Sequence, residues 1–277
     1  MRRATFVVPQ NELVGPNLAS ILVTGSEGFI GNAVAKALAE ANHDVIGMDL
    51  AGQKSSNVPY TYVQGDIRKI SDLTRVTRDV EFIYHFAAAS NLNFSRENPL
   101  ETINLNVMAT ANLSEICRRK GARLIFASSD HIYGNRRKKI LTENTPPAPN
   151  EIYASSKVAG EHVVRSFGKR NTILRLGTVY GPRMRRELAI FLFLSKAHRE
   201  DEIAIHSPGT QRRQYVYIDD IVEGSTLAMK TRAEGEIINL PGSETISVME
   251  LVYTCIRLIR SKSRVIFLPS REGDIDC

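Results

Sequence analysis

Short, mostly apolar runs alternate with segments in which apolar residues recur every three or four positions. The runs, typical of strands buried in a sheet, occupy residues 20–24, 44–49, 60–64, 81–86, 122–127 and 172–175. Helical spacing predicts helices over residues 30–41, about 99–120 and about 153–167, and a late strand is expected within 233–240. Strands that alternate with helices predict an α/β fold with a doubly wound parallel sheet, the Rossmann fold.

The alternation loosens after Gly181-Pro182, which suggests a second structural unit. We assign residues 21–182 and 214–242 to the sheet domain, and 183–213 and 243–277 to a smaller C-terminal lobe. Residues 1–20 precede the first strand and form an N-terminal extension to which the sequence assigns no role.

Composition and charge exclude several classes of protein. The 277 residues are 43% hydrophobic and 24% charged, as in an ordinary globular protein. The net charge is +6, but the basic residues are scattered except for short runs at 118–120 and 136–139, so no nucleic-acid partner is expected. No apolar run is long enough to span a membrane, and residues 1–20 lack the core of a signal peptide. We therefore expect no membrane partner and a cytoplasmic location.

The three cysteines lie far apart in the sequence, at Cys117, Cys255 and Cys277. The first two fall within apolar helical patterns and are predicted to be core thiols, a usage that suits a reducing compartment. The histidines show no metal-ligand spacing, so no metal site is predicted.

Gly25, Gly28 and Gly31 are spaced three apart where the first strand meets the first helix. Such a turn brings a pyrophosphate to the backbone N–H groups of a helix N-terminus. Asp49 ends the second strand, where a carboxylate binds both hydroxyls of a ribose and repels a 2′-phosphate. The sequence therefore predicts a dinucleotide site that prefers NAD to NADP.

Tyr153 and Lys157 are four residues apart on a predicted helix and share one face. The lysine cation is expected to lower the pKa of the phenol, which would make Tyr153 a general base. Ser129, at the end of a strand, can orient a substrate hydroxyl. Together with the glycine turn, these residues predict an enzyme that oxidises a secondary alcohol.

Eight blocks in order resemble the extended short-chain dehydrogenase/reductase family, specifically its nucleotide-sugar epimerases and dehydratases such as the UDP-glucose/UDP-galactose 4-epimerases. The resemblance runs from Ile21 to about Asp274. The blocks are TGSEGFIG (24–31), GDI (65–67), HFAA (85–88), NVMAT (106–110), LIFASS with YG (124–129 and 133–134), RLGTVYGP (175–182), GTQRR with YVYIDD (209–213 and 215–220), and REGD (271–274).

The resemblance implies NAD as cofactor, a nucleotide-diphosphate sugar as substrate, and a homodimer built on the helices at 99–120 and 153–167. It implies that Ser129, Tyr153 and Lys157 are catalytic. The implied cofactor-binding residues are Gly25, Glu27, Gly28, Phe29, Ile30, Gly31, Asp49, Asp66, Ile67, Phe86, Ala87, Ala88, Asn106, Tyr153 and Lys157. The implied substrate-binding residues are Ser129, Asp130, Thr178, Arg213 and Arg271, with the two arginines on the diphosphate.

Some positions depart from the family pattern. Thr178 stands where many members carry Asn, and Gln214 where they carry Asp. Members of the family also continue past the block at 271–274, so a truncated chain or a reduced lobe is expected here.

The resemblance leaves the reaction open. Epimerisation at C4 through a transient 4-keto sugar needs only the Ser, Tyr and Lys, and is the first prediction. Family 4,6-dehydratases carry Asp-Glu where this chain has Asp130-His131. Because histidine also moves protons, dehydration stays an alternative. A decarboxylase would carry a Glu near the Ser, which is absent here. A net oxidoreductase and a non-catalytic NAD-binding sensor or scaffold are further alternatives.

Overall fold

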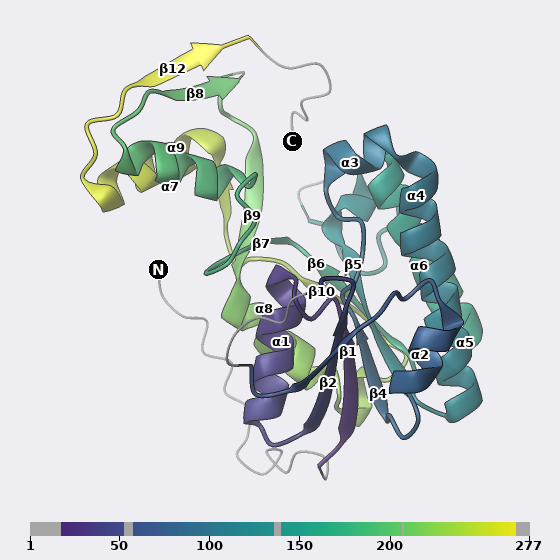
Figure 1. Ribbon diagram of the computed structural model, residues 1–277. Coiled ribbons are helices and arrows are strands. Elements are labelled where there is room, and N and C mark those ends of the chain that lie inside the picture. Colours follow the sequence, from purple (N-terminus) through teal and green to yellow (C-terminus); the bar gives the residue numbers. More distant parts are fainter. Residues whose placement is uncertain (1–17, 53–57, 136–139, 207, 270–277) are drawn as a thin grey trace.

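The structure is a computed structural model and describes residues 18–52, 58–135, 140–206 and 208–269. Within these residues seven strands form a parallel sheet in the order β10-β6-β5-β4-β1-β2-β3 (Figure 1). The strands are β1 (Ser20–Thr24), β2 (Asp44–Asp49), β3 (Thr61–Gln64), β4 (Phe82–His85), β5 (Arg123–Ser129), β6 (Thr172–Leu176) and β10 (Ile237–Leu240). The predicted doubly wound fold is confirmed.

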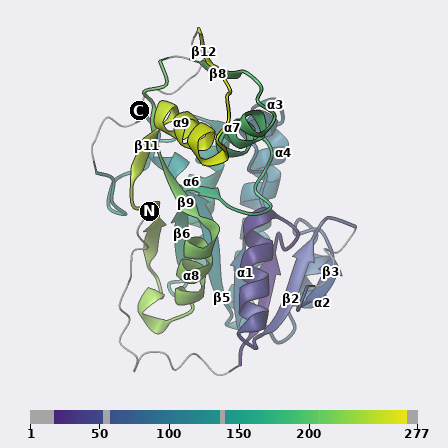
Figure 2. The same cartoon turned by 90° about the vertical axis from the view of Figure 1, so that its left-hand side faces the viewer.

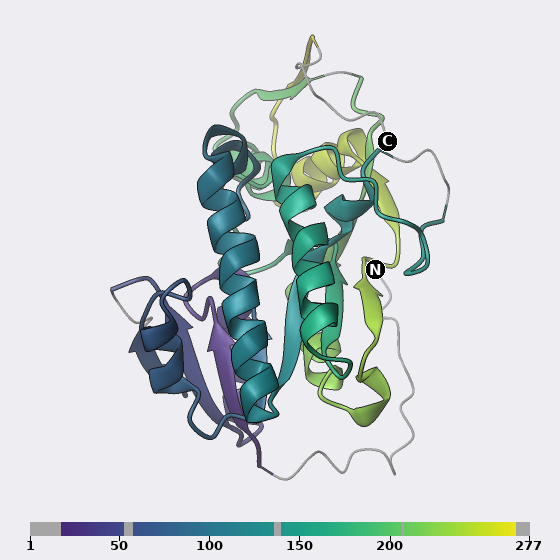
Figure 3. The same ribbon diagram turned by 90° about the vertical axis from the view of Figure 1, so that its right-hand side faces the viewer.

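Helices cover both faces of this sheet. One face carries α1 (Phe29–Glu40) and α8 (Ile218–Leu227), which lie side by side (Figure 2). The other carries α2 (Ile70–Val76), α5 (Ala109–Lys120) and α6 (Ile152–Phe167), of which α5 and α6 run side by side in Figure 3. Two apolar clusters, one on each face, form the core and bury side chains such as Ile21 and Phe126.

The helix predicted over 99–120 contains a change of pitch. It begins as α4 (Pro99–Ile103), passes through a π-helical turn (Asn104–Met108) and continues as α5. A π turn inserts one extra residue and often marks a functional site. Here it turns the Asn106 side chain inward, where it is buried. The helix α3 (Leu92–Glu97), capped by Asn91, precedes α4 and was not predicted.

The later residues form a lobe beyond the carboxyl edge of the sheet (Figure 1). Its helices α7 (Ala189–His198) and α9 (Val248–Ile259) pack with strands β8 (Ile203–His206) and β12 (Val265–Leu268) around a small apolar cluster. A sheet of β11 (Thr245–Ser247), β9 (Arg212–Tyr217) and β7 (Thr178–Tyr180) joins this lobe to the main sheet. Two short 3₁₀ segments, Asp130–Tyr133 and Thr231–Ala233, complete the described elements. The exact domain boundaries stay a prediction.

The predicted core thiols Cys117 and Cys255 are buried in α5 and α9. Most of the N-terminal extension, the basic run at 136–139, Arg271 and Cys277 lie outside the described residues. No helix in the described part of the chain has the length and apolar character needed to cross a bilayer.

Candidate active site

A cavity of about 550 Å³ opens at the carboxyl ends of the parallel strands. The strand order of the sheet reverses between β1 and β4, and ligands of open α/β sheets bind in the crevice at that point. Most of the predicted site residues line the cavity: Gly25, Gly28, Phe29, Ile30, Gly31, Asp49, Asp66, Ile67, Phe86, Ala87, Ala88, Ser129, Asp130, Tyr153, Lys157 and Thr178.

The glycine turn forms one wall of the cavity. Gly25 has a φ of +75°, and a Cβ there would lie 2.7 Å from the backbone nitrogen of Ala87, so both conformation and space require glycine. Gly28 is the N-cap of α1. The first N–H groups of a helix have no partner within it, and Phe29, Ile30 and Gly31 line the cavity. This wall therefore suits an anion such as a pyrophosphate.

Asp49 is fixed at the end of β2 by the backbone. Its carboxylate accepts hydrogen bonds from the N–H of Glu27 (2.9 Å) and the N–H of Ala51 (3.1 Å). Glu27 thus takes part through its backbone and does not itself line the cavity. Farther along the wall, Arg68 lies 2.8 Å from Asp66 and holds the pKa of that carboxyl below its usual range.

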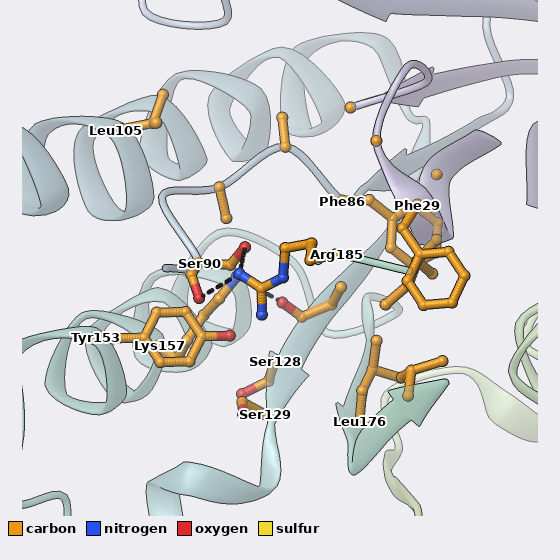
Figure 4. Close-up of a pocket in the computed structure, with 18 of the residues that line it drawn as sticks. Phe29, Phe86, Ser90, Leu105, Ser128, Ser129, Tyr153, Lys157, Leu176 and Arg185 are labelled. Carbon is orange, nitrogen blue, oxygen red and sulfur yellow. Dashed lines mark hydrogen bonds between the residues drawn. The ribbon is translucent and has the colours of Figure 1, made fainter. Parts of the chain in front are cut away.

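Ser129, Tyr153 and Lys157 come together on the opposite side (Figure 4). Ser129 ends β5, and the other two stand one turn apart on α6. The buried Lys157 ammonium donates to the carbonyl oxygen of Ala127 (2.8 Å) and lies 6.0 Å from the centre of the Tyr153 ring. A phenol, a hydroxyl and a cation thus face one space, as alcohol oxidation requires.

The expected lowering of the Tyr153 pKa is wrong for the protein as described. Burial raises the pKa of Tyr153 to about 12, and the neighbouring Ser129 hydroxyl offsets this only in part. Burial also lowers the pKa of Lys157 to about 8, against the attraction of Glu161. The lysine donates to a backbone carbonyl, and desolvation of the phenol outweighs the effect of nearby cations.

Asn106 does not line the cavity. Its amide oxygen accepts a hydrogen bond from the N–H of Ala89 (2.7 Å). Its amide nitrogen donates to the Ala89 carbonyl oxygen (3.1 Å) and to the Ser156 hydroxyl (2.9 Å). The residue therefore braces the loop after β4 against α6. This placement does not favour the predicted direct contact between Asn106 and the cofactor.

The predicted substrate residues are only partly brought together. Asp130 and Thr178 line the cavity, whereas Arg213, on β9, does not. The charge of Arg213 nevertheless reaches the site, since it lowers the pKa of Asp130 and of His131 against larger opposing effects. Arg271 lies outside the described residues.

Sequence reasoning missed Arg185, which follows β7. Its guanidinium donates to the carbonyl oxygen (3.0 Å) and the hydroxyl (3.4 Å) of Ser90, and Figure 4 shows it inside the cavity between Tyr153 and Phe29. Arg185 belongs to the stretch Arg183-Met-Arg-Arg186, which in sequence looks like a solvated turn. Only the fold shows that one member of this stretch enters the cavity.

A buried ionic network connects the elements that carry the site residues. Glu161 on α6 accepts two hydrogen bonds from Arg175 on β6 (3.0 and 2.8 Å) and one from the Ser128 hydroxyl (2.6 Å). Arg175 also donates to the Tyr133 hydroxyl (2.8 Å). These bonds tie α6, which carries Tyr153 and Lys157, to the strand end that carries Ser129.

The fold and cavity define a dinucleotide-binding α/β enzyme. The chain belongs, moreover, to the NAD dependent epimerase/dehydratase family, whose model matches residues 21–240. The predicted family, the class of enzyme and the NAD dependence are thereby confirmed.

Relatives in this family carry two activities in their names. A putative UDP-glucose 4-epimerase of Methanocaldococcus jannaschii is 33% identical, over 92% of this chain and 87% of its own. The human dTDP-D-glucose 4,6-dehydratase is 31% identical, over 87% of this chain and 74% of its own. A crystal structure of UDP-glucuronic acid 4-epimerase from Bacillus cereus, with UDP-glucuronic acid and NAD, matches with a TM-score of 0.84 and 28% identity, over 93% of this chain and 88% of that one.

Proposed function

We propose that this protein is an NAD-dependent nucleotide-sugar 4-epimerase. The observation that carries the proposal is one cavity lined by the glycine turn and Asp49 at one end and by Ser129, Tyr153 and Lys157 at the other. The names of the M. jannaschii and B. cereus relatives support the substrate class and the reaction.

The residues present fit NAD. The turn from Gly25 to Gly31 offers backbone N–H groups to a pyrophosphate, and the Asp49 carboxylate stands ready for ribose hydroxyls. Lys157 uses one of its three N–H donors on Ala127, which leaves two for the nicotinamide ribose. When bound, NAD supplies the acceptor, and later the donor, of the hydride at C4 of the sugar.

Residues of the chain itself transfer the proton of the C4 hydroxyl. Ser129 orients the C4 hydroxyl, and Tyr153 takes its proton as the hydride leaves and returns it when the hydride comes back on the other face. With a pKa of about 12 the phenol is protonated at neutral pH in the protein as described. The proposal therefore requires that the phenol lose this proton in the loaded site, where Lys157 and Ser129 stabilise the phenolate.

Substrate binding is assigned from the family resemblance and from the residues that line the cavity. We assign the diphosphate to Arg213 and Arg271 on the resemblance, and the sugar to Ser129, Asp130 and Thr178, which line the cavity. Arg185 adds a cation to the lining of the cavity.

Dehydration is the second candidate. Burial raises the pKa of the Asp130 carboxyl, the direction that favours a proton donor to a leaving hydroxyl. The human relative is named a 4,6-dehydratase. The mass of the product separates the two reactions.

The first test incubates the protein with NAD and a panel of UDP-, GDP-, dTDP- and CDP-sugars. Epimerisation gives a product of unchanged mass and new retention, whereas dehydration removes one water. Tyr153→Phe should lower the rate by about 10²–10⁴-fold, because it removes the proton-transfer group and little else. Tyr253→Phe, on the exposed face of α9, is the matched control and should leave the rate unchanged. Bound NAD without any product would refute the proposal and favour a sensor.

A homodimer is part of the proposal. Leu100, Ile103 and Met108 expose apolar side chains on the helical run from α4 to α5, beside α6 (Figure 3). Burial of such a face in a partner copy would remove it from water. Leu100→Glu with Met108→Glu should convert a dimer to a monomer in light scattering. Leu258→Glu should not, although Leu258 lies exposed on α9, to an extent between those of Leu100 and Met108. A wild-type monomer would contradict the assignment. A cytoplasmic location is likewise proposed.

A further inference from the structure

His85 is a buried, titratable side chain that the proposed reaction does not use. It ends β4, is 1% exposed and does not line the cavity, whereas the next three residues, 86–88, do. Its imidazole lies between two buried hydroxyls. Nδ1 is 2.9 Å from the hydroxyl of Thr24, at the end of β1, and Nε2 is 3.0 Å from the hydroxyl of Thr110, in α5.

The two hydroxyls decide which ring nitrogen carries the proton. Thr110 donates its only O–H to the carbonyl oxygen of Asn106 at 2.6 Å, so toward His85 it accepts. Nε2 therefore carries a hydrogen and donates it to Thr110. Thr24 accepts the N–H of Ala87 at 3.4 Å, and its own O–H donates to the lone pair on Nδ1. The neutral tautomer with its proton on Nε2 satisfies all of these groups.

The surroundings of His85 oppose a second proton on the ring. With Nδ1 protonated, the Thr24 hydroxyl would face another donor and lose its acceptor. Burial lowers the pKa of His85 to about 3, and the Lys157 ammonium acts in the same direction. The histidine in the cavity differs, because Nδ1 of His131 lies 2.7 Å from the Glu151 carboxylate, which raises its pKa. His85 is therefore a neutral link between hydroxyls.

These hydrogen bonds continue as one chain from the glycine turn to the catalytic helix α6. At one end, Thr24 leads into the glycine turn. At the other end, the amide nitrogen of Asn106 donates to the Ser156 hydroxyl (2.9 Å), which donates to the carbonyl oxygen of Tyr153 (2.7 Å). His85 is the member that joins the two halves of the chain.

We propose that His85 is a positioning residue that, as the tautomer with its proton on Nε2, fixes the cofactor loop at 86–89 relative to Tyr153. Its effect on NAD binding rests on the family match, and its effect on the reaction rests on the proposed function. The imidazole acts through its neighbours, since it does not line the cavity. A fixed link holds the nicotinamide and the phenol at the separation that the reaction needs, and a small misplacement of reacting groups slows a reaction strongly.

The first measurement is NAD affinity, by isothermal titration of protein stripped of NAD. Thr110→Val keeps the shape of a side chain that is buried away from the cavity, but removes the acceptor of His85. It should weaken NAD binding by about tenfold, because buried hydrogen bonds are lost. Thr110→Ser, which keeps the hydroxyl, should restore the affinity.

A double-mutant cycle separates the link through His85 from other effects of Thr110. His85→Phe removes both hydrogen bonds of the ring and should weaken NAD binding as Thr110→Val does. The double variant should bind NAD as weakly as the worse single variant, because both changes cut the same link. Additive losses would mean independent effects and would overturn the inference.

Tyr84→Phe is the matched control. Tyr84 precedes His85 in β4, is fully buried, and donates to the carbonyl oxygen of Ser225 (2.8 Å) on the opposite face of the sheet. Its loss should lower stability to urea without a change in NAD affinity. Equal losses of NAD affinity in this variant and in His85→Phe would reduce His85 to a structural role and overturn the inference.

Kinetics at saturating NAD give a second reading of position. For UDP-glucose, kcat of Thr110→Val should fall by about tenfold or more, because the reacting groups are misplaced. The KM for the sugar should stay unchanged, since Ser129, Asp130 and Thr178 lie on other elements. A raised KM with unchanged kcat would contradict the positioning role.

NMR of protein labelled with ¹⁵N-histidine measures the tautomer directly. The His85 signal, identified by its absence from His85→Phe, should show a proton on Nε2 alone between about pH 5 and 8. A proton on Nδ1, or wild-type NAD affinity in Thr110→Val, would overturn the inference and leave the proposed epimerase standing. The expected tautomer and NAD affinities, without turnover of any sugar, would support the link and refute the proposed function.

Discussion

The buried pair of Glu161 and Arg175 offers a strong test of how the site is held. Their side chains are only 6% and 3% exposed. Glu161→Gln keeps the shape of the side chain but removes its charge, so the Arg175 guanidinium stays buried without a counter-charge. The change also weakens the hydrogen bond that Glu161 accepts from the Ser128 hydroxyl at 2.6 Å.

The magnitude follows from burial. Removal of one partner of a buried ion pair typically costs about 3–5 kcal/mol, because the other charge stays desolvated. For a chain of this size such a loss lowers the melting temperature by roughly 6–20 °C. The Tyr133 hydroxyl and the Glu143 carbonyl oxygen still accept from Arg175, which favours the lower half of that range.

The assay is urea unfolding followed by circular dichroism, with thermal melts as a second measure. Asp201→Asn is the matched control, because Asp201 pairs with Arg199 at 2.8 Å where both side chains are half exposed or more. Such pairs contribute about 0–1 kcal/mol. Equal losses in the two variants would refute the reasoning, because they would mean that Arg175 finds water or another partner once Glu161 is neutral.

Two further predictions concern the ends of the cavity. Asp49→Asn should weaken NAD binding by about tenfold or more, because a charged hydrogen-bond acceptor is lost. It should also narrow the protein's preference for NAD over NADP. Isothermal titration with both cofactors measures the two affinities, and an unchanged preference would contradict the ribose assignment. The pKa of His131, followed by NMR, should lie above 6.5 and fall toward 6.5 in Glu151→Gln. Since the folded-state pKa is the higher one, the stabilisation by this pair is complete below pH 6.5 and is lost as the pH rises through the folded-state pKa. A wild-type protein without this loss, relative to Glu151→Gln, would show that the pair does not form in solution.

The sequence was a good guide to the sheet and to residues whose type the chemistry dictates. A strand buried on both faces is mostly apolar, as residues 21–23 of β1 and 124–127 of β5 show. Gly25 must be glycine because its φ is +75° and no Cβ fits beside Ala87. Such requirements restrict the residue type at each position, so the spacing of these residues can be recognised in the sequence.

The placement of charged residues near the cavity cannot be predicted from residue spacing in this way. Arg185 and Glu151 look like solvated turn residues, and Glu151 lies 20 positions from His131. Asn106 was predicted to contact the cofactor, but the π turn directs it to Ala89. Where a side chain goes in these cases depends on helix pitch and loop path, which residue patterns do not record.

The pKa of Tyr153 is a second property that the residue pattern did not predict. Spacing of four residues correctly placed Tyr153 and Lys157 on one helical face, and attraction between a phenolate and an ammonium is sound chemistry. Spacing does not reveal that both groups are desolvated, or that the ammonium donates to Ala127. Burial penalises the charged form of each group, so it moves the two pKa values in opposite directions, that of Tyr153 from 10.0 to about 12 and that of Lys157 from 10.5 to about 8. In this state the neutral phenol is favoured, and its activation must come from whatever charge the loaded site brings to the cavity.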